Sequence, residues 1–118
     1  MAAAKQLAIN FVTVDYTKVD VDIARVKAGA TGEFLKSYST SAADLTKVLV
    51  ANQTVSTVQR TEAALVSGDQ DSAVALVGVV APTKNTAVPN GETKTYRMRL
   101  DLRMVGDVWK VETLEFVG

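Results

Sequence analysis

The stretch from Tyr96 to Gly118 alternates apolar and polar residues with the two-residue period of a β-strand. The apolar positions of its first arm are Tyr96, Met98, Leu100, Leu102 and Met104. Gly106-Asp107 then forms a two-residue turn signal, which predicts a β-hairpin with Val105 opposite Val108. One face of this hairpin should contact a core and the other should contact water. The preceding residues must therefore supply the elements that cover the apolar face.

The alternation slips by one position in the second arm of the hairpin. Leu102 would face Val111, but the next apolar residues, Leu114 and Phe116, then fall on the polar face. A β-bulge near residues 112–113 would return both side chains to the apolar face. Because bulges bend strands, we expect a curved sheet.

The first half of the chain has helical periodicity. Leu7, Phe11 and Val14 lie at i, i+4 and i+7, which predicts a helix over about residues 2–14. Asp20 is a candidate N-cap for a second helix. The chain therefore begins with amphipathic helices.

Two shorter helices are expected to follow. Gly29 stands where the second helix would end in the left-handed conformation. Thr31 is a candidate cap for a third helix that ends near Ser39. Residues 41–44 resemble a capping box for a fourth helix, with Asp in place of Glu or Gln.

β-Strand character begins at Val55. Residues 55–66 mix β-branched and polar side chains and predict a strand with a bend near Thr61. Residues 73–80 are apolar on both alternating faces, which is typical of a strand covered on both sides. We expect the core to cover one face and a partner subunit to cover the other. Residues 82–91 predict a polar loop.

Together these elements predict one α+β domain over residues 1–118. Helices occupy about residues 2–53, and about four long antiparallel strands occupy residues 55–117. Helices followed by long, bent strands suggest a cone in which the sheet curls around a helix. Such a cone can hold a ligand.

The composition excludes several kinds of chemistry. The chain has no cysteine and no histidine, so thiolate and imidazole catalysis and the usual metal ligands are absent. Thirteen basic and thirteen acidic residues balance, which does not suit a nucleic-acid binder. No apolar run approaches the ~20 residues that cross a bilayer. We therefore expect no catalytic residue, no metal site, no cofactor and no nucleic-acid partner.

The aromatic residues are the best candidates for a ligand site. Their rings are either core packing or the lining of a pocket, and the tyrosine hydroxyls need partners or water if buried. The candidate ligand-facing residues are Tyr16, Phe34, Tyr38, Tyr96 and Trp109. Phe11 and Phe116 are predicted core positions, as are Phe34 and Trp109.

Helices up to Gln53, followed by long strands that end in Trp109-Lys110-Val111, resemble the nuclear-transport-factor-2-like (NTF2-like, cystatin-like or SnoaL-type) cone fold. A narrower set of strings resembles the soluble domain of actinobacterial Mce-associated membrane proteins. These strings are residues 15–22, residues 30–34 with Tyr38, residues 54–57, residues 98–100 and residues 109–117.

The narrower resemblance implies a function without catalysis. Members of that family are implicated as accessory or stabilising factors of Mce lipid and sterol import systems. The resemblance implies a transmembrane helix upstream of these residues and a soluble domain on the extracytoplasmic side of the cytoplasmic membrane. It leads us to expect self-association, as a dimer, or binding of Mce transport components through the sheet face. A lipid or sterol in the cone is a further expectation.

Two alternatives stay open at this point. The first is a cone-fold enzyme of the ketosteroid-isomerase or dehydratase kind, with Tyr16 and Asp101 as its nearest candidates. The alternation, however, places Asp101 on the face opposite Leu100 and Leu102, away from a cavity. The second is a cone filled by its own methionines and aromatic rings, with no ligand.

Overall fold

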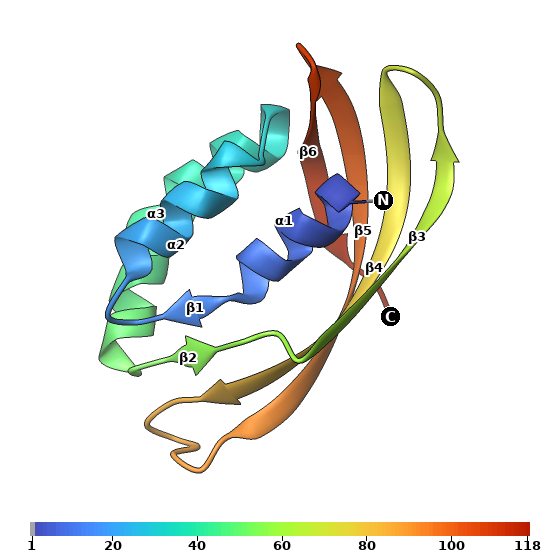
Figure 1. The fold of residues 1–118 in the computed structure, drawn as a ribbon. Helices are drawn as coiled ribbons and strands as arrows, with labels where there is room; N and C mark the ends of the chain where they lie inside the picture. The colour runs from blue at the N-terminus through green and yellow to red at the C-terminus, as the bar shows by residue number, and fades with distance from the viewer. Residues whose placement is uncertain (1) are drawn as a thin grey trace.

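A computed structural model describes residues 2–118 of the chain. These residues form three helices and six strands, with the helices on the concave side of a bent antiparallel sheet (Figure 1). The helices are α1 (Ala2–Val12), α2 (Val19–Ala28) and α3 (Gly32–Ala51). The strands are β1 (Val14–Asp15), β2 (Val55–Ser56), β3 (Arg60–Gly68), β4 (Ser72–Lys84), β5 (Glu92–Val105) and β6 (Val108–Phe116). The expected α+β fold, with helices packed in a curved antiparallel sheet, is confirmed.

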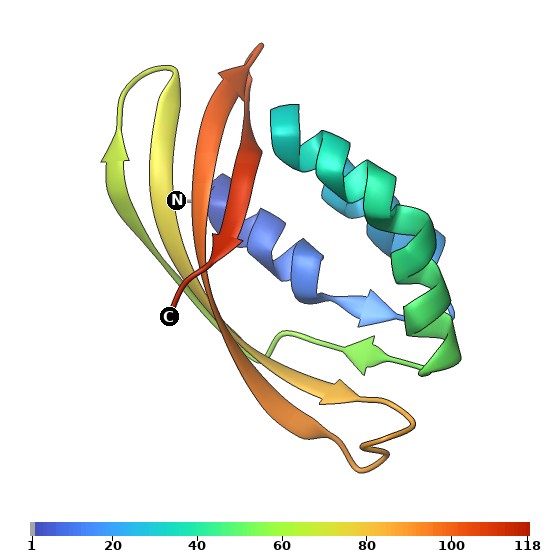
Figure 2. The same ribbon diagram turned by 180° about the vertical axis from the view of Figure 1, so that it is seen from behind.

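The sheet is built around β4. This strand pairs with β5 along one side, and on its other side it pairs with β3 and, near its end, with β2. The order continues through β5 to β6 in one direction and through β2 to β1 in the other. Figure 2 shows β4 and β5 sweeping beneath the helices, so that the sheet wraps around α1.

The C-terminal hairpin has the predicted register. Val105 pairs with Val108 across the turn, and the pairing shifts between Asp101 and Leu102 because Glu112 is an extra residue on β6. Beyond this bulge Leu100 lies opposite Leu114, as the slipped alternation required. The predicted bulge is confirmed.

The predicted division of residues 31–52 into two helices is wrong, because α3 is one helix of 20 residues. The polar stretch that suggested a break is accommodated inside the helix. The Thr40 hydroxyl donates to the Lys36 carbonyl at 2.9 Å, and the Thr46 hydroxyl donates to the Ala42 carbonyl at 2.8 Å. Hydroxyl groups bonded back to the preceding turn need no helix end.

Two other local predictions are corrected. Helix α2 begins one residue before Asp20, which therefore lies in the first turn and is not the cap. Gly29 has a φ of −98°, so it is not left-handed. A Cβ at Gly29 would lie 3.1 Å from Leu7 Cδ2, so the glycine is explained by close packing of α1 against this turn.

The strand predicted over residues 55–66 is interrupted, but not at Thr61. It is divided into β2 and β3 at residues 57–59. Backbone N–H groups of Thr57 and Gln59 still donate to carbonyls of β4, at 3.1 Å and 2.8 Å. The segment therefore bends while staying against the same neighbouring strand. Strand β4 also extends to Lys84, into the predicted loop.

The core lies between α1 and the concave face of the sheet. Small side chains meet there, because Ala4 and Ala8 of α1 and Ala75 and Ala81 of β4 are fully buried. Alanines on both sides allow a helix to approach a sheet closely. The larger buried side chains around them are Leu7, Val26, Val77, Val79, Met98, Leu100, Leu102 and Val111.

The side chains of β4 alternate between the core and the outer face of the sheet, as predicted. Its odd-numbered residues from Ala73 to Ala81 face the core, and its even-numbered residues Val74, Leu76 and Val80 face outward. Leu76 is 43% exposed. Within residues 2–118, none of the helices is both long and apolar enough to cross a lipid bilayer.

Candidate functional site

Five aromatic rings gather on the concave side, between the helices and the sheet. This aromatic cluster consists of Phe11, Phe34, Tyr38, Tyr96 and Phe116. Phe11 is its centre, since its ring centroid lies 6.0 Å from those of Phe34, Tyr38 and Phe116. The centroid distances suit favourable tilted and edge-on aromatic contacts. Residues from α1, α3, β5 and β6 are thereby held together.

Tyr38 is the half-buried polar member of the cluster. Burial raises the pKa of its hydroxyl above the ordinary value of 10.0, and the negative charge of Asp22 raises it further. The hydroxyl is therefore protonated at neutral pH and is available as a hydrogen-bond donor.

A hollow of about 280 Å³ adjoins the aromatic cluster, and we call it the concave hollow. It is lined by Phe11, Val12, Val14, Leu49, Thr54, Ser56, Thr83, Asn85, Lys94, Tyr96 and Phe116. The apolar residues come from α1, β1, α3, β5 and β6, and most of the polar ones come from β2, β4 and the segments beside them. An apolar wall with a few polar groups is the usual composition of a small-molecule site.

The polar side chains of the concave hollow are already partly engaged. The buried hydroxyls of Ser56 and Thr83 lie 3.2 Å apart, and the Thr83 hydroxyl also donates to the Ala81 carbonyl. Lys94 Nζ lies 3.6 Å from a carboxylate oxygen of Glu92. Lys94 is the cationic residue of the lining and could contact an anionic group of a ligand.

The structure brings three of the five predicted ligand-facing residues together and leaves two apart. Phe34, Tyr38 and Tyr96 belong to the aromatic cluster, and Tyr96 also lines the concave hollow. Tyr16 follows β1, where its backbone N–H donates to the Thr54 carbonyl at 3.0 Å, and it does not line the hollow. Trp109 lies opposite Met104 near the hairpin turn and packs on the core.

Sequence reasoning missed other members of the site. Phe11 and Phe116 were expected only as core residues, but both line the hollow, and Phe116 is 56% exposed. The exposure contradicts the core placement of Phe116, which lies at the open end of an edge strand. Thr83 and Asn85 had no signal beyond the polarity of a predicted loop.

The two residues considered for an isomerase-like site are not placed together. Asp101 pairs with Val74 and Thr113 on the outer face of the sheet, whereas its neighbours Leu100 and Leu102 are buried in the core. Tyr16 follows β1, at one end of the strand order, and its backbone N–H bonds to the Thr54 carbonyl just before β2. Among residues 2–118, no group of three or more acidic side chains is arranged to hold a metal ion.

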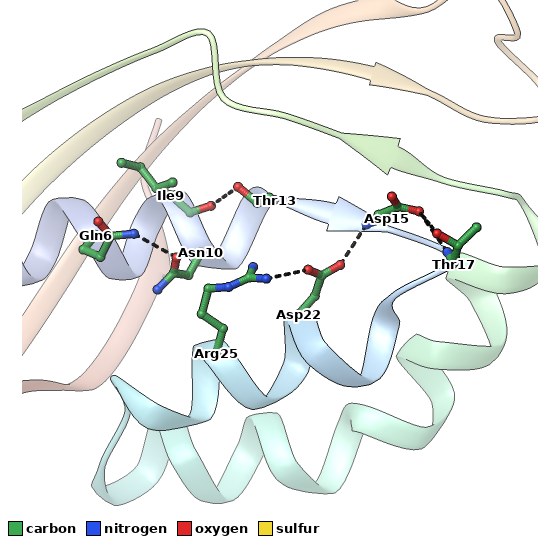
Figure 3. Close-up of polar contacts among 8 residues, drawn as sticks. All are labelled: Gln6, Ile9, Asn10, Thr13, Asp15, Thr17, Asp22 and Arg25. Atoms are coloured by element: carbon green, nitrogen blue, oxygen red, sulfur yellow. Dashed lines mark hydrogen bonds and ion pairs between the residues drawn. The ribbon is translucent and has the colours of Figure 1, made fainter.

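A buried carboxylate fixes the strand that borders the concave hollow. Asp22 accepts a hydrogen bond from the backbone N–H of Asp15 at 2.8 Å, and Arg25 lies 3.1 Å from its other oxygen (Figure 3). Asp15 in turn accepts bonds from the hydroxyl and the N–H of Thr17. These bonds lower the pKa of the Asp15 carboxyl, chiefly through the hydroxyl of Thr17. The short β1, which carries Val14, is thereby held against α2.

The outer face of the sheet presents a second candidate surface, which we call the outer patch. Its apolar members are Ala64, Val74, Leu76 and Val80, and a hollow of about 380 Å³ lies beside them around Gly78. Glu62 and Arg97 border this hollow on either side. Ala64 and Leu76 are exposed, and Val74 and Val80 are half-buried. An accessible apolar patch with a charged border is typical of a protein-binding surface.

Comparison with known sequences finds one family profile and one relative that match nearly the whole chain. A profile of the family described as "Uncharacterized protein Rv1363c/MT1408-like" matches residues 1–118. The protein Rv1363c of Mycobacterium tuberculosis is 34% identical to the chain over 116 residues. The match covers 98% of the chain and 44% of that relative, so the chain spans less than half of the relative's length.

Comparison with solved structures finds the same fold at low sequence identity. An IcmL-like type IV secretion system protein from Legionella pneumophila has a TM-score of 0.74 at 15% identity, covering 98% of the chain and 88% of that protein. The periplasmic domain of DotI has a TM-score of 0.69 at 12% identity, with coverages of 98% and 91%. An NTF2-like protein involved in plasmid conjugation has a TM-score of 0.68 at 11% identity, with coverages of 99% and 47%. The curled sheet and its helices therefore match NTF2-like folds.

Proposed function

The chain belongs to the Rv1363c/MT1408-like family, and from this premise we propose that it is a non-enzymatic accessory domain that binds other proteins. Its proposed setting is an Mce-type lipid or sterol import system on the extracytoplasmic side of the cytoplasmic membrane. The strings that resemble Mce-associated membrane proteins support this setting. The fold likeness to a type IV secretion protein and to a periplasmic domain agrees with an accessory role in a membrane assembly.

The observation that carries the proposal is the outer patch. Leu76 stands 43% exposed in the middle of the sheet, with Val74 and Val80 on the same face of the same strand. Covering such a leucine stabilises a complex by about 1–2 kcal/mol, on the scale of roughly 25 cal/mol per Å² of apolar surface. The sequence of β4 predicts a strand that is covered on both faces. A partner bound to the outer patch would cover the face that the core does not.

Co-purification tests the proposal. The protein would be produced together with the Mce transport components and recovered through an affinity tag. We expect the components to co-purify with the wild type and to be lost with Leu76→Asp. Val48→Asp is the matched control, since Val48 is 55% exposed and belongs to α3, a helix that Figure 1 shows on the other side of the molecule from the outer face of the sheet. Failure of the wild type to retain the components, or equal retention by Leu76→Asp, would contradict the proposal.

The concave hollow supports a second function, the binding of a lipid. Its volume of about 280 Å³ lies just below the ~300–1,000 Å³ range of ligand pockets, so a single acyl chain fits better than a whole sterol. The aromatic cluster occupies the neighbouring part of the concave side, and we place the ligand in the hollow beside it. Lys94 would contact the carboxylate of a fatty acid.

A further inference from the structure

Gly78 creates a gap at the centre of the outer patch. It lies between Val77 and Val79, which face the core, so its missing side chain would point outward. A Cβ added there would meet no atom within 4 Å. Glycine within a strand often marks a place where another backbone approaches closely. A second sheet could therefore come nearest to this one at Gly78.

Opposite charges flank Gly78 on the two neighbouring strands. In the register of the sheet, Glu62 of β3 pairs with Gly78 on one side and Arg97 of β5 pairs with it on the other. Their backbones lie two strand spacings of ~4.8 Å apart, and the ion pairs among residues 2–118 include none between Glu62 and Arg97. Each is held only loosely, since Glu62 lies 3.7 Å from Arg60 and Arg97 donates to the Gly118 carbonyl at 3.3 Å. Both side chains are exposed.

From this arrangement we infer that the outer patch binds a second copy of the chain, about a two-fold axis that runs parallel to β4 over Gly78. This axis exchanges the two sides of the strand, so Glu62 of each copy faces the partner's Arg97. Leu76 and Val80 then pack against the same residues of the other copy. Sheets packed face to face lie ~10 Å apart, and their strands cross at about 30°. Strands of the two copies are therefore best aligned at the crossing point, where Gly78 lies.

The charges of Glu62 and Arg97 also make a dimer about the other two-fold axis over Gly78 unfavourable. An axis running across the strands would place Glu62 against its own copy and Arg97 against its own copy. Both contacts would be repulsive, whereas the axis along β4 makes two attractive contacts. The pattern of charges thus selects one orientation of the dimer.

Charge reversal tests this orientation directly. The pure chain would be examined by sedimentation velocity over a series of concentrations, as wild type, Glu62→Arg, Arg97→Glu and the double variant. Each single reversal turns both symmetry-related contacts repulsive and should raise the dimer dissociation constant by about tenfold or more. The double variant restores both contacts and should return the constant to within a few-fold of the wild type. Lys36→Glu, an exposed reversal on α3, should have no effect.

Gly78→Lys provides a second test that leaves the fold intact, because the site has open space and an ordinary backbone conformation. It places two like charges at the centre of the interface and should abolish the dimer without changing the circular dichroism spectrum. A wild type that stays monomeric, or a double variant no better than the single ones, would overturn the inference. The inference rests on the proposed binding role of the outer patch and makes a second copy its occupant when no transport component is bound, and it can fail alone. A monomer that still retains the transport components through Leu76 would refute the dimer and leave the proposed function standing.

Discussion

The carboxylate of Asp22 accepts a hydrogen bond from the backbone N–H of Asp15 at 2.8 Å, and this bond joins α2 to the first strand of the sheet (Figure 3). Asp22 is buried, and its second oxygen is engaged by Arg25. Helix α2 also supplies Val26 to the core. One side chain therefore connects the packing of the helices with the wall of the concave hollow.

Replacing Asp22 by alanine should destabilise the protein by about 2–3 kcal/mol, because the Asp15 N–H and the Arg25 guanidinium lose their acceptor. Urea unfolding followed by circular dichroism measures this cost. Asp20→Ala is the matched control, since Asp20 is exposed on the same helix and should cost less than about 0.5 kcal/mol. Equal losses for the two variants would show that the bond to Asp15 contributes nothing specific.

Tyr38 should ionise at a higher pH than an ordinary tyrosine. Burial raises its pKa above 10.0, and the charge of Asp22 adds to the effect. Because the folded state holds the proton more tightly, the stability that Tyr38 contributes is complete below pH 10 and is lost as the pH rises through the folded pKa. Absorbance titration of tyrosinate should show a late step that is absent in Tyr38→Phe and occurs earlier in Asp22→Asn. A late step that persists in Tyr38→Phe would refute the assignment.

Phe11→Ala should cost about 2–3 kcal/mol of unfolding free energy, since Phe11 contacts three other rings and packs against the core. Phe116→Ala should cost about 1 kcal/mol, because Phe116 is 56% exposed. Denaturant unfolding of both variants gives the comparison. A larger loss for Phe116 would mean that Phe11 is not the centre of the cluster.

The concave hollow should bind dodecanoate, a single-chain fatty acid. Leu49→Trp places a larger side chain in the hollow and should abolish binding, whereas Leu45→Trp, one turn earlier on α3 and outside the lining, should leave it unchanged. Lys94→Gln should weaken binding by about tenfold through the lost charge. Isothermal titration calorimetry measures all four proteins. If Leu49→Trp binds as well as the wild type, the fatty acid lies elsewhere.

Much of the sheet could be predicted from local pattern. The alternation of residues 96–105 and the turn at Gly106-Asp107 determine the hairpin, because a strand buried on one face has a period of two. The apolar–polar alternation of β6 shifts by one position before Leu114. One extra residue is needed to keep Leu114 on the inner face, and Glu112 is that residue. The polar stretch within α3 was ambiguous, because hydroxyl groups can either cap a helix or bond back to the preceding turn.

The candidate site could be predicted only in part. Phe34, Tyr38 and Tyr96 converge because each lies on the inner face of its own element. Tyr16 follows a two-residue strand, and its position depends on the contact of β1 with the segment around Thr54, which no local pattern specifies. Trp109 pairs with Met104 and Phe116 pairs with Met98, so Trp109 is displaced along the hairpin from the cluster by its position in β6.

Site-specific photocrosslinking from position 76 is the most direct test of the claim that this domain acts by binding proteins through its outer patch. The protein, with a photoreactive residue in place of Leu76 or of Val48, would be irradiated in cells that produce the Mce transport components, and crosslinked products would be identified by mass spectrometry. We predict products from position 76 that contain a transport component or a second copy of the chain, and none from position 48. Products from position 48 alone, or equal products from both positions, would contradict the account.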